Sequence, residues 1–128
     1  FAKATKEVEM LAMDAVMAAE RSLGHTPRDV SIDKLGYDIE SKDGKTGRLR
    51  FIEVKGRVAD ANTVTVTKNE VHTSLNKPDE FILAIVLVDG SSTRTQYIRK
   101  PFAKELDFHA SSVNYDLDDL LAMATQPN

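Results

Sequence analysis

Hydrophobic side chains follow two different spacings along this chain. Over residues 3–23 they recur every three or four positions, which predicts an amphipathic helix ending at Gly24 (Val8, Leu11, Ala12, Ala15, Ala19 and Leu23). Residues 63–67 instead alternate strictly between Thr and Val, a β-branched pattern that predicts a strand. Residues 81–88 form a continuous apolar run, which is typical of a strand covered on both faces.

Turn-forming residues separate the remaining predicted elements. Residues 28–35 read as a connector, and residues 114–116 as the approach to the last helix. The other predicted elements are strands at 35–41, 48–55 and 93–99 and helices at 68–76 and 116–124, the last with Asp116 as N-cap. The order α-β-β-β-α-β-β-α predicts an α/β fold, with helices on the faces of a mixed sheet.

The first two predicted strands pair naturally as a hairpin around the Gly-rich turn at 43–47. Antiparallel pairing then joins residues whose numbers add up to about 91. In this register Ile39 lies opposite Ile52, and Tyr37 lies opposite Val54. Both pairs are apolar, so this face of the hairpin is expected to be core, and a slip by one residue would expose it.

The same register brings three charged residues together on the other face. Asp38 lies opposite Glu53, and Lys55 follows on the same side roughly 7 Å further along. Opposed like charges destabilise a strand pair, and a cation between them removes that penalty. The alternative is a solvated face with a surface ion pair between Glu53 and Lys55. The apolar neighbours of both residues favour a buried strand, in which charges need partners, and hence a metal site.

Two acidic residues outside the hairpin are further candidates. Glu20 lies at the edge of the apolar stripe of the first helix, from which it can reach over the sheet toward the metal or remain solvated. Glu70 follows Thr67 by three residues, which predicts a capping box at the start of the second helix. That helix start can also direct Asn69 or Glu70 into the site.

Composition narrows the classes of function. The 128 residues are expected to form a single domain, and a first residue other than Met indicates an excised piece of a longer protein. The chain has no Cys, which excludes disulfides and cysteine-bound zinc and fits the cytoplasm. No apolar run approaches the roughly 18 residues of a membrane span, so we expect no membrane partner.

Charge is unevenly distributed. The net charge of −3 argues against binding of nucleic acid by overall charge alone. Residues 42–57 nevertheless contain six basic and two acidic side chains, whereas the segment 105–119 is acidic.

Three runs of residues follow one another along the chain: Gly36-Tyr37-Asp38-Ile39, Ile52-Glu53-Val54-Lys55-Gly56 and Val66-Thr67-Lys68-Asn69-Glu70. In this order they resemble the PD-(D/E)xK nuclease superfamily, although Tyr37 stands where the superfamily name has proline. Within that superfamily the chain is similar, from about residue 6 to residue 124, to the domain of unknown function named after the C terminus of the plant NO VEIN protein. The resemblance implies a restriction-endonuclease-like fold and a position near the C terminus of a larger protein.

The resemblance also implies roles for individual residues. Asp38, Glu53 and the Val54 carbonyl would bind Mg²⁺, with Mn²⁺ as a substitute. Lys55 would orient or deprotonate the attacking water and stabilise charge at phosphorus, and Glu20 would be an accessory acid. Weaker accessory candidates are Glu70 and Asn69, and the residues expected to hold the DNA backbone are Arg48, Arg50 and Arg57.

Two functions of different classes follow. The first is a Mg²⁺-dependent DNA endonuclease module attached to a restriction or helicase-type protein. The second is a non-catalytic nuclease-fold module that docks DNA or a protein, in a homodimer if a composite groove is needed. A purely structural α/β domain without a site is a third interpretation.

Overall fold

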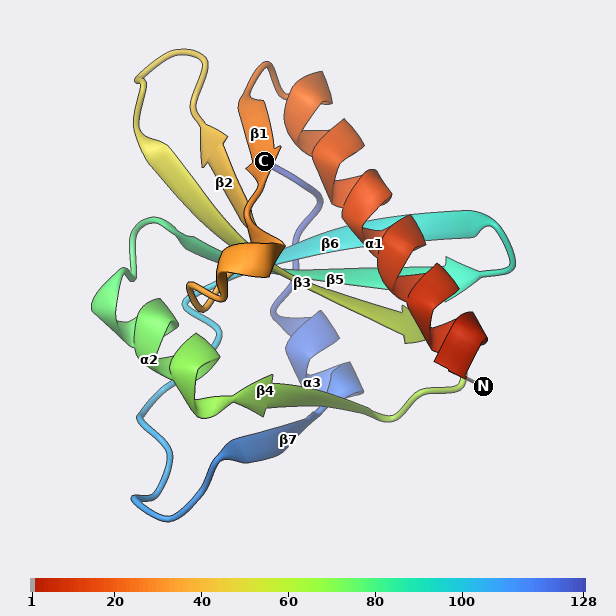
Figure 1. Cartoon of the computed structure of the whole chain (residues 1–128), viewed down its shortest axis with the longest axis vertical. Helices are drawn as coiled ribbons and strands as arrows, with labels where there is room; N and C mark the ends of the chain where they lie inside the picture. Colours follow the sequence, from red (N-terminus) through yellow and green to blue (C-terminus); the bar gives the residue numbers. More distant parts are fainter. Residues whose placement is uncertain (1) are drawn as a thin grey trace.

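A five-stranded mixed sheet crosses the middle of the protein, with helices on its two sides (Figure 1). The computed structural model describes residues 2–128, with side chains from residue 5 onward. Its elements are α1 (Ala2–Ser22), β1 (Thr26–Asp29), the 3₁₀ turn η1 (Ser31–Asp33), β2 (Ile39–Lys42), β3 (Leu49–Val58), β4 (Thr63–Thr67), α2 (Lys68–Asn76), β5 (Phe81–Asp89), β6 (Ser92–Arg99), β7 (Ser112–Asp116) and α3 (Leu117–Ala122).

The large sheet has the strand order β1-β2-β3-β5-β6, and β4 pairs with β7 in a separate two-stranded sheet. Strands β3 and β5 run parallel, while the other pairs are antiparallel. The predicted α/β class, a mixed sheet flanked by helices, is confirmed. Among the described residues, no helix is both long enough and apolar enough to span a membrane.

Two strands contradict the sequence-based prediction. The expected connector 28–35 contains the end of β1 and the turn η1, and the segment expected only to lead into the last helix belongs to β7. Strand β1 includes Pro27 and lies at the sheet edge, where strands need no apolar alternation. Strand β7 contains Asn114 and Asp116, residue types that are depleted in strands. The predicted N-cap at Asp116 is confirmed, because its carboxylate accepts from the Asp119 N–H.

Strand β5 is buried on both faces, as its continuous apolar run predicts. Ile82, Ala84 and Val86 pack toward α1. Alternate residues of the same strand belong to a second core, with side chains from β4, α2 and α3 (Phe81, Leu83 and Ile85). The large sheet therefore lies between two layers. Helix α1 covers one face, and the small sheet with α2 and α3 covers the other.

The predicted hairpin register is confirmed where β2 and β3 pair, with Ile39 opposite Ile52. The expected pair of Tyr37 and Val54 is wrong. Tyr37 stacks on Phe51, with ring centroids 4.6 Å apart, and packs against the core around α2, whereas Val54 packs against the α1 side. Regular pairing ends at Ile39 because the preceding chain turns at Gly36, whose φ is +89°.

The early end of β2 leaves half of β3 with one neighbour. Strand β2 pairs with β3 only as far as Ile52, while β5 accompanies β3 through to Val58. Helix α1 approaches this half closely, because a Cβ on Gly56 would lie 2.8 Å from the Ala12 Cβ. We define the β2-facing side of residues 53–58 as the open edge of β3.

Candidate functional site

Asp38 is held against the start of the open edge. Its N–H donates to the Ile52 carbonyl at 2.9 Å, and its carboxylate accepts from the Val54 N–H at 3.0 Å. Burial raises the pKa of Asp38, although the hydrogen bonds from Val54 and Glu53 and the charge of Lys55 oppose that shift. The loop before β2 therefore fixes one carboxylate over the middle of β3.

Glu53 is the buried partner of Asp38 in this site. Only 4% of the residue is exposed, although β3 directs it toward a cavity. Burial, together with the negative charge of Asp38, raises the pKa of Glu53 to about 10. The two carboxyl groups therefore do not both carry a charge near neutral pH unless a cation joins them.

Lys55 lies between two acids. Its Nζ donates to Glu70 Oε1 at 2.9 Å and lies 3.3 Å from Glu53 Oε2. Burial alone would lower the pKa of Lys55, but these two carboxylates raise it above its ordinary value. The ammonium group is thus held in its charged form.

Glu70 forms the predicted capping box and also contacts Lys55. It completes the capping box of α2, since its carboxylate accepts from the Thr67 N–H at 2.9 Å while its own N–H donates to Thr67 Oγ1. The same carboxylate binds Lys55. Asn69 lines a different cavity, beside Lys68 and the segment around Phe108, so the structure does not bring it to the Asp38 site.

A cavity of about 690 Å³ follows the open edge of β3. Its walls come from α1, the 3₁₀ turn and β4, and its polar lining includes Asp38, Glu53 and Lys55. The Val54 N–H points to the open edge, and the N–H and C=O of one strand residue point the same way. The Val54 carbonyl is therefore directed toward the same space as the two carboxylates.

Whether a metal ion fits this cavity depends on the oxygen and nitrogen atoms that could coordinate it. No group of three or more His, Cys, Asp or Glu side chains among the described residues is arranged to hold a metal. Asp38, Glu53 and the Val54 carbonyl instead offer two carboxylates and one backbone oxygen, the hard ligands that suit Mg²⁺. Burial and the charge of Asp38 raise the pKa of Glu53 even with Lys55 beside it, and a further cation at this point would favour the charged form. This donor set fits a divalent cation with the remaining positions filled by water or substrate.

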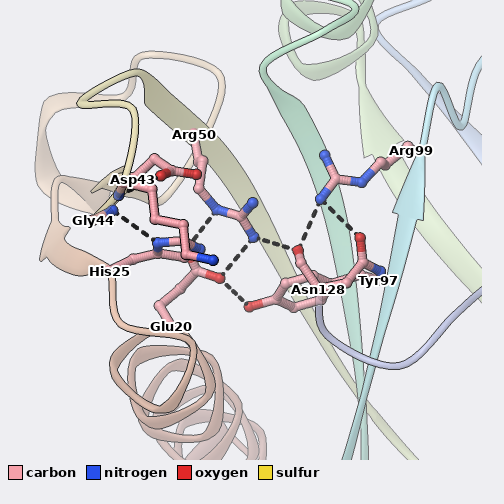
Figure 2. Close-up of polar contacts among 9 residues, drawn as sticks. Glu20, His25, Asp43, Gly44, Arg50, Tyr97, Arg99 and Asn128 are labelled. Atoms are coloured by element: carbon pink, nitrogen blue, oxygen red, sulfur yellow. Dashed lines mark hydrogen bonds and ion pairs between the residues drawn. The ribbon is translucent and has the colours of Figure 1, made fainter.

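Glu20 does not lie in this cavity. Its carboxylate is fully buried and accepts from Arg50 Nε at 2.8 Å, Arg50 Nη2 at 3.0 Å and the Tyr97 hydroxyl at 2.7 Å, as Figure 2 shows. Burial would raise the pKa of Glu20, but hydrogen bonds with Arg50, Ser41 and Tyr97 hold it below its ordinary value. The structure gives this residue a place in an internal ion pair instead of the expected place beside Asp38.

The acid of α1 that lines the cavity is Glu9. The lining residues of α1 end at Met13, and Glu20 lies about 10 Å further along the helix axis. Glu9 neighbours Val8 and precedes Ala12 by three residues, so its place beside the apolar stripe was visible in the sequence. Both glutamates border that stripe, and the direction of α1 across the sheet decides which one faces the cavity.

The three predicted DNA-binding arginines are separated. Arg50 is committed to Glu20, and its Nη2 also donates to the main-chain oxygen of Asn128, which Arg99 binds as well (Figure 2). Arg48 is exposed at the start of β3. Arg57 alone of the three lines the cavity of Asp38 and Glu53.

Comparison with known proteins finds a match to a family model. Residues 8–98 match the family model described as Protein NO VEIN, C-terminal. The match includes β1 through nearly all of β6 and therefore Asp38, Glu53, Lys55 and Glu70. No curated protein and no solved structure matches the chain.

Proposed function

This chain belongs to the family of NO VEIN C-terminal domains, and we propose that it is a Mg²⁺-dependent nuclease domain of the PD-(D/E)xK type that hydrolyses phosphodiester bonds in DNA. One observation carries the proposal. Asp38 and the buried Glu53 face each other at a solvent-accessible cavity, with Lys55 beside them. Opposed buried carboxyls are costly without a cation, and a purely structural site does not require them.

In this proposal different residues of the site bind the metal and stabilise the substrate. Asp38, Glu53 and the Val54 carbonyl would hold Mg²⁺, for which Mn²⁺ is the expected substitute. When bound, the metal would polarise the phosphate and lower the pKa of an attacking water. Asp38 is already oriented by the Val54 N–H, and Glu53 by its place in the centre of the sheet.

Lys55 is best suited to stabilising negative charge. Its raised pKa keeps it protonated, which favours the interaction with charge developing on the phosphate oxygens over proton abstraction from water. Glu70 keeps the ammonium group in place through the 2.9 Å contact. Glu70 is therefore a positioning residue, and its capping role anchors it to the start of α2.

The biological setting belongs to the same proposal. We expect the domain to act on DNA as part of a larger restriction or helicase-type protein, following the resemblance in its three motifs. A cytoplasmic location rests on the cysteine-free composition. The DNA backbone would be held by charge, without reading of the base sequence.

Cleavage by the purified chain tests this function. Supercoiled and linear DNA are incubated with Mg²⁺ or Mn²⁺, and we expect cleavage that depends on the divalent ion and is lost in Asp38→Ala and Lys55→Ala. Calorimetry with each metal accompanies the assay. Failure to cut any DNA form, together with no heat of metal binding, would contradict the proposal for this chain.

A non-catalytic docking module is the second candidate. Lys55 already forms ion pairs with Glu53 and Glu70, and the net charge of the chain is −3. Both observations favour a binding mode in which Lys55 does not contact a phosphate group. In that case DNA or a partner protein binds without being cut, and a homodimer can complete the groove. Gel-shift binding that is unaffected by Asp38→Ala, in the absence of cleavage, would favour docking over hydrolysis.

A further inference from the structure

Beyond Glu53, the open edge of β3 carries backbone groups that no other strand uses. Residues 53–58 pair on one side with β5, while β2 stops at Ile52. Alternate residues of a strand direct their N–H and C=O to opposite neighbours. Since the Val54 N–H points to the open edge, the N–H of Gly56 points there too, and Gly56 lines the same cavity.

Arg57 adds a charged donor at this position. Its side chain shares a face of β3 with Glu53 and Lys55, because alternate strand residues point the same way. Arg57 is half-buried, and its Nε is shielded from solvent with no hydrogen-bond partner in the described part of the chain. A buried donor without an acceptor is unfavourable, so a shift of the Arg57 side chain toward an acceptor in the cavity would relieve this cost.

Arg57 also differs from the other cations near the site. Of the two cations that line the cavity, Lys55 lies within 3.3 Å of Glu53 and within 2.9 Å of Glu70. Arg57 takes part in no ion pair with the described residues. Its positive charge is therefore available to an anion that enters the cavity.

We propose that Arg57 and the Gly56 N–H bind a phosphate group of the substrate next to the phosphate that is cleaved. This subsite rests on the proposed function, since it takes the ligand to be a phosphodiester chain. The Arg57 Cα lies about 13 Å along β3 from the Glu53 Cα, and the Gly56 N–H and the long Arg57 side chain shorten the distance to the reacting phosphate. A planar guanidinium recognises phosphate through two parallel donors and reads no base.

The absence of a side chain on Gly56 supports this arrangement. A Cβ there would meet Ala12 and the Val8 carbonyl at 2.8 Å and 3.1 Å, so α1 packs directly on the strand. This close packing fixes the wall of the cavity opposite β4. The lining of the cavity includes both the acidic cluster and Arg57, so a substrate chain that follows β3 can contact both.

Binding of a short fluorescein-labelled DNA, as duplex and as single strand, tests the subsite by anisotropy in EDTA, which prevents cleavage. We expect Arg57→Gln to weaken binding about tenfold and to reduce the salt dependence by about one charge. Arg57→Lys keeps the charge and loses the Nε donor, so it should bind with intermediate affinity. Arg94→Gln removes an exposed arginine of β6 and serves as the matched control, with wild-type binding expected.

The outcomes separate the subsite from the hydrolysis. Equal binding by wild type and Arg57→Gln, with equal melting temperatures, overturns the subsite even if Mg²⁺-dependent cleavage is observed. Arg57-dependent binding without any cleavage by wild type keeps the subsite and removes the hydrolysis. No binding of either DNA by wild type at low salt overturns the subsite as well.

Discussion

The Asp38 carboxylate accepts a hydrogen bond from the Val54 N–H at 3.0 Å, which ties the segment before β2 to the middle of β3. This bond satisfies an edge donor that β2 is too short to reach. The same carboxylate also interacts with Glu53 and lines the cavity. Because the pairing of β2 with β3 ends at Ile39, the Val54 N–H is left to orient Asp38, and the space beside β3 stays open for a substrate.

Asp38→Asn should strongly weaken metal binding while preserving the fold. The amide oxygen can still accept from the Val54 N–H, but the negative charge needed to hold a cation is lost. A direct ligand should matter at least as much as an outer-shell partner, so we expect metal affinity to fall by about a hundredfold or more. Calorimetry measures this loss, and thermal unfolding with and without Mn²⁺ should show ligand stabilisation in wild type alone. Unchanged affinity would remove Asp38 from the metal site.

Glu20→Gln should cost stability, and any effect on cleavage should follow from that loss. It removes one partner of a buried ion pair and leaves Arg50 uncompensated, which costs about 3 kcal/mol. Glu40→Gln is the control, because its pair with Arg28 is exposed and is worth less than about 1 kcal/mol. Urea unfolding measures both. Full stability with lost cleavage would instead make Glu20 a catalytic acid.

The same ion pair predicts a pH dependence of stability. The pKa of Glu20 is lowered in the folded protein from its ordinary value of 4.5. Its contribution to the free energy of unfolding is therefore complete above pH 4.5 and is lost as the pH falls through the lower folded pKa. Below pH 4.5 the stability of wild type should fall more steeply than that of Glu20→Gln. Parallel curves in acid would contradict this role.

Glu9→Gln should weaken metal binding moderately, as measured by calorimetry. Glu9 is an exposed acid of α1 that lines the cavity with Asp38 and Glu53, so its charge adds to the field that attracts a divalent cation. Exposed charge interactions are worth up to about 1 kcal/mol, which corresponds to about a fivefold loss of metal affinity. Glu7→Gln is the matched control, since Glu7 is exposed on the same helix and does not line the cavity. Equal effects of the two substitutions would show that only overall charge matters.

Gly56→Ala should displace α1. Because the new Cβ would meet the Ala12 Cβ at 2.8 Å and the Val8 carbonyl at 3.1 Å, the helix must shift, at a cost of about 1–3 kcal/mol. Ala12→Gly in the same protein removes the nearest contact and should recover part of this loss, against about 1 kcal/mol for Gly within a helix. Denaturant unfolding of both single variants and the double variant gives the coupling between them. Additive costs would show that α1 is not the obstacle.

Local sequence patterns predicted those elements in which the spacing of apolar or capping side chains reflects burial or helix capping. The apolar run of β5, the stripe of α1 and the capping box of Thr67 and Glu70 all form as expected. Strands β1 and β7 were missed because polar edge strands have little apolar pattern of their own. The pair of Tyr37 and Val54 was wrong because the turn at Gly36 ends the ladder earlier than an apolar pattern indicates.

The sequence by itself determined the pairing of Ile39 with Ile52, because apolar burial allows only one register. Asp38 and Glu53 directly adjoin this last pair of the ladder, and the turn at Gly36 and the hydrogen bond from the Val54 N–H fix Asp38 beyond it. Only the tertiary structure decided which acids and arginines join them. Glu20 and Glu9 border the same helical stripe, and Arg50 and Arg57 belong to the same strand. The direction of α1 over the sheet buries Glu20 against Arg50, thirty positions away, and leaves Glu9 and Arg57 at the cavity. Such long-range pairing depends on how whole helices and strands pack, and the local spacing of residues along the sequence does not encode it.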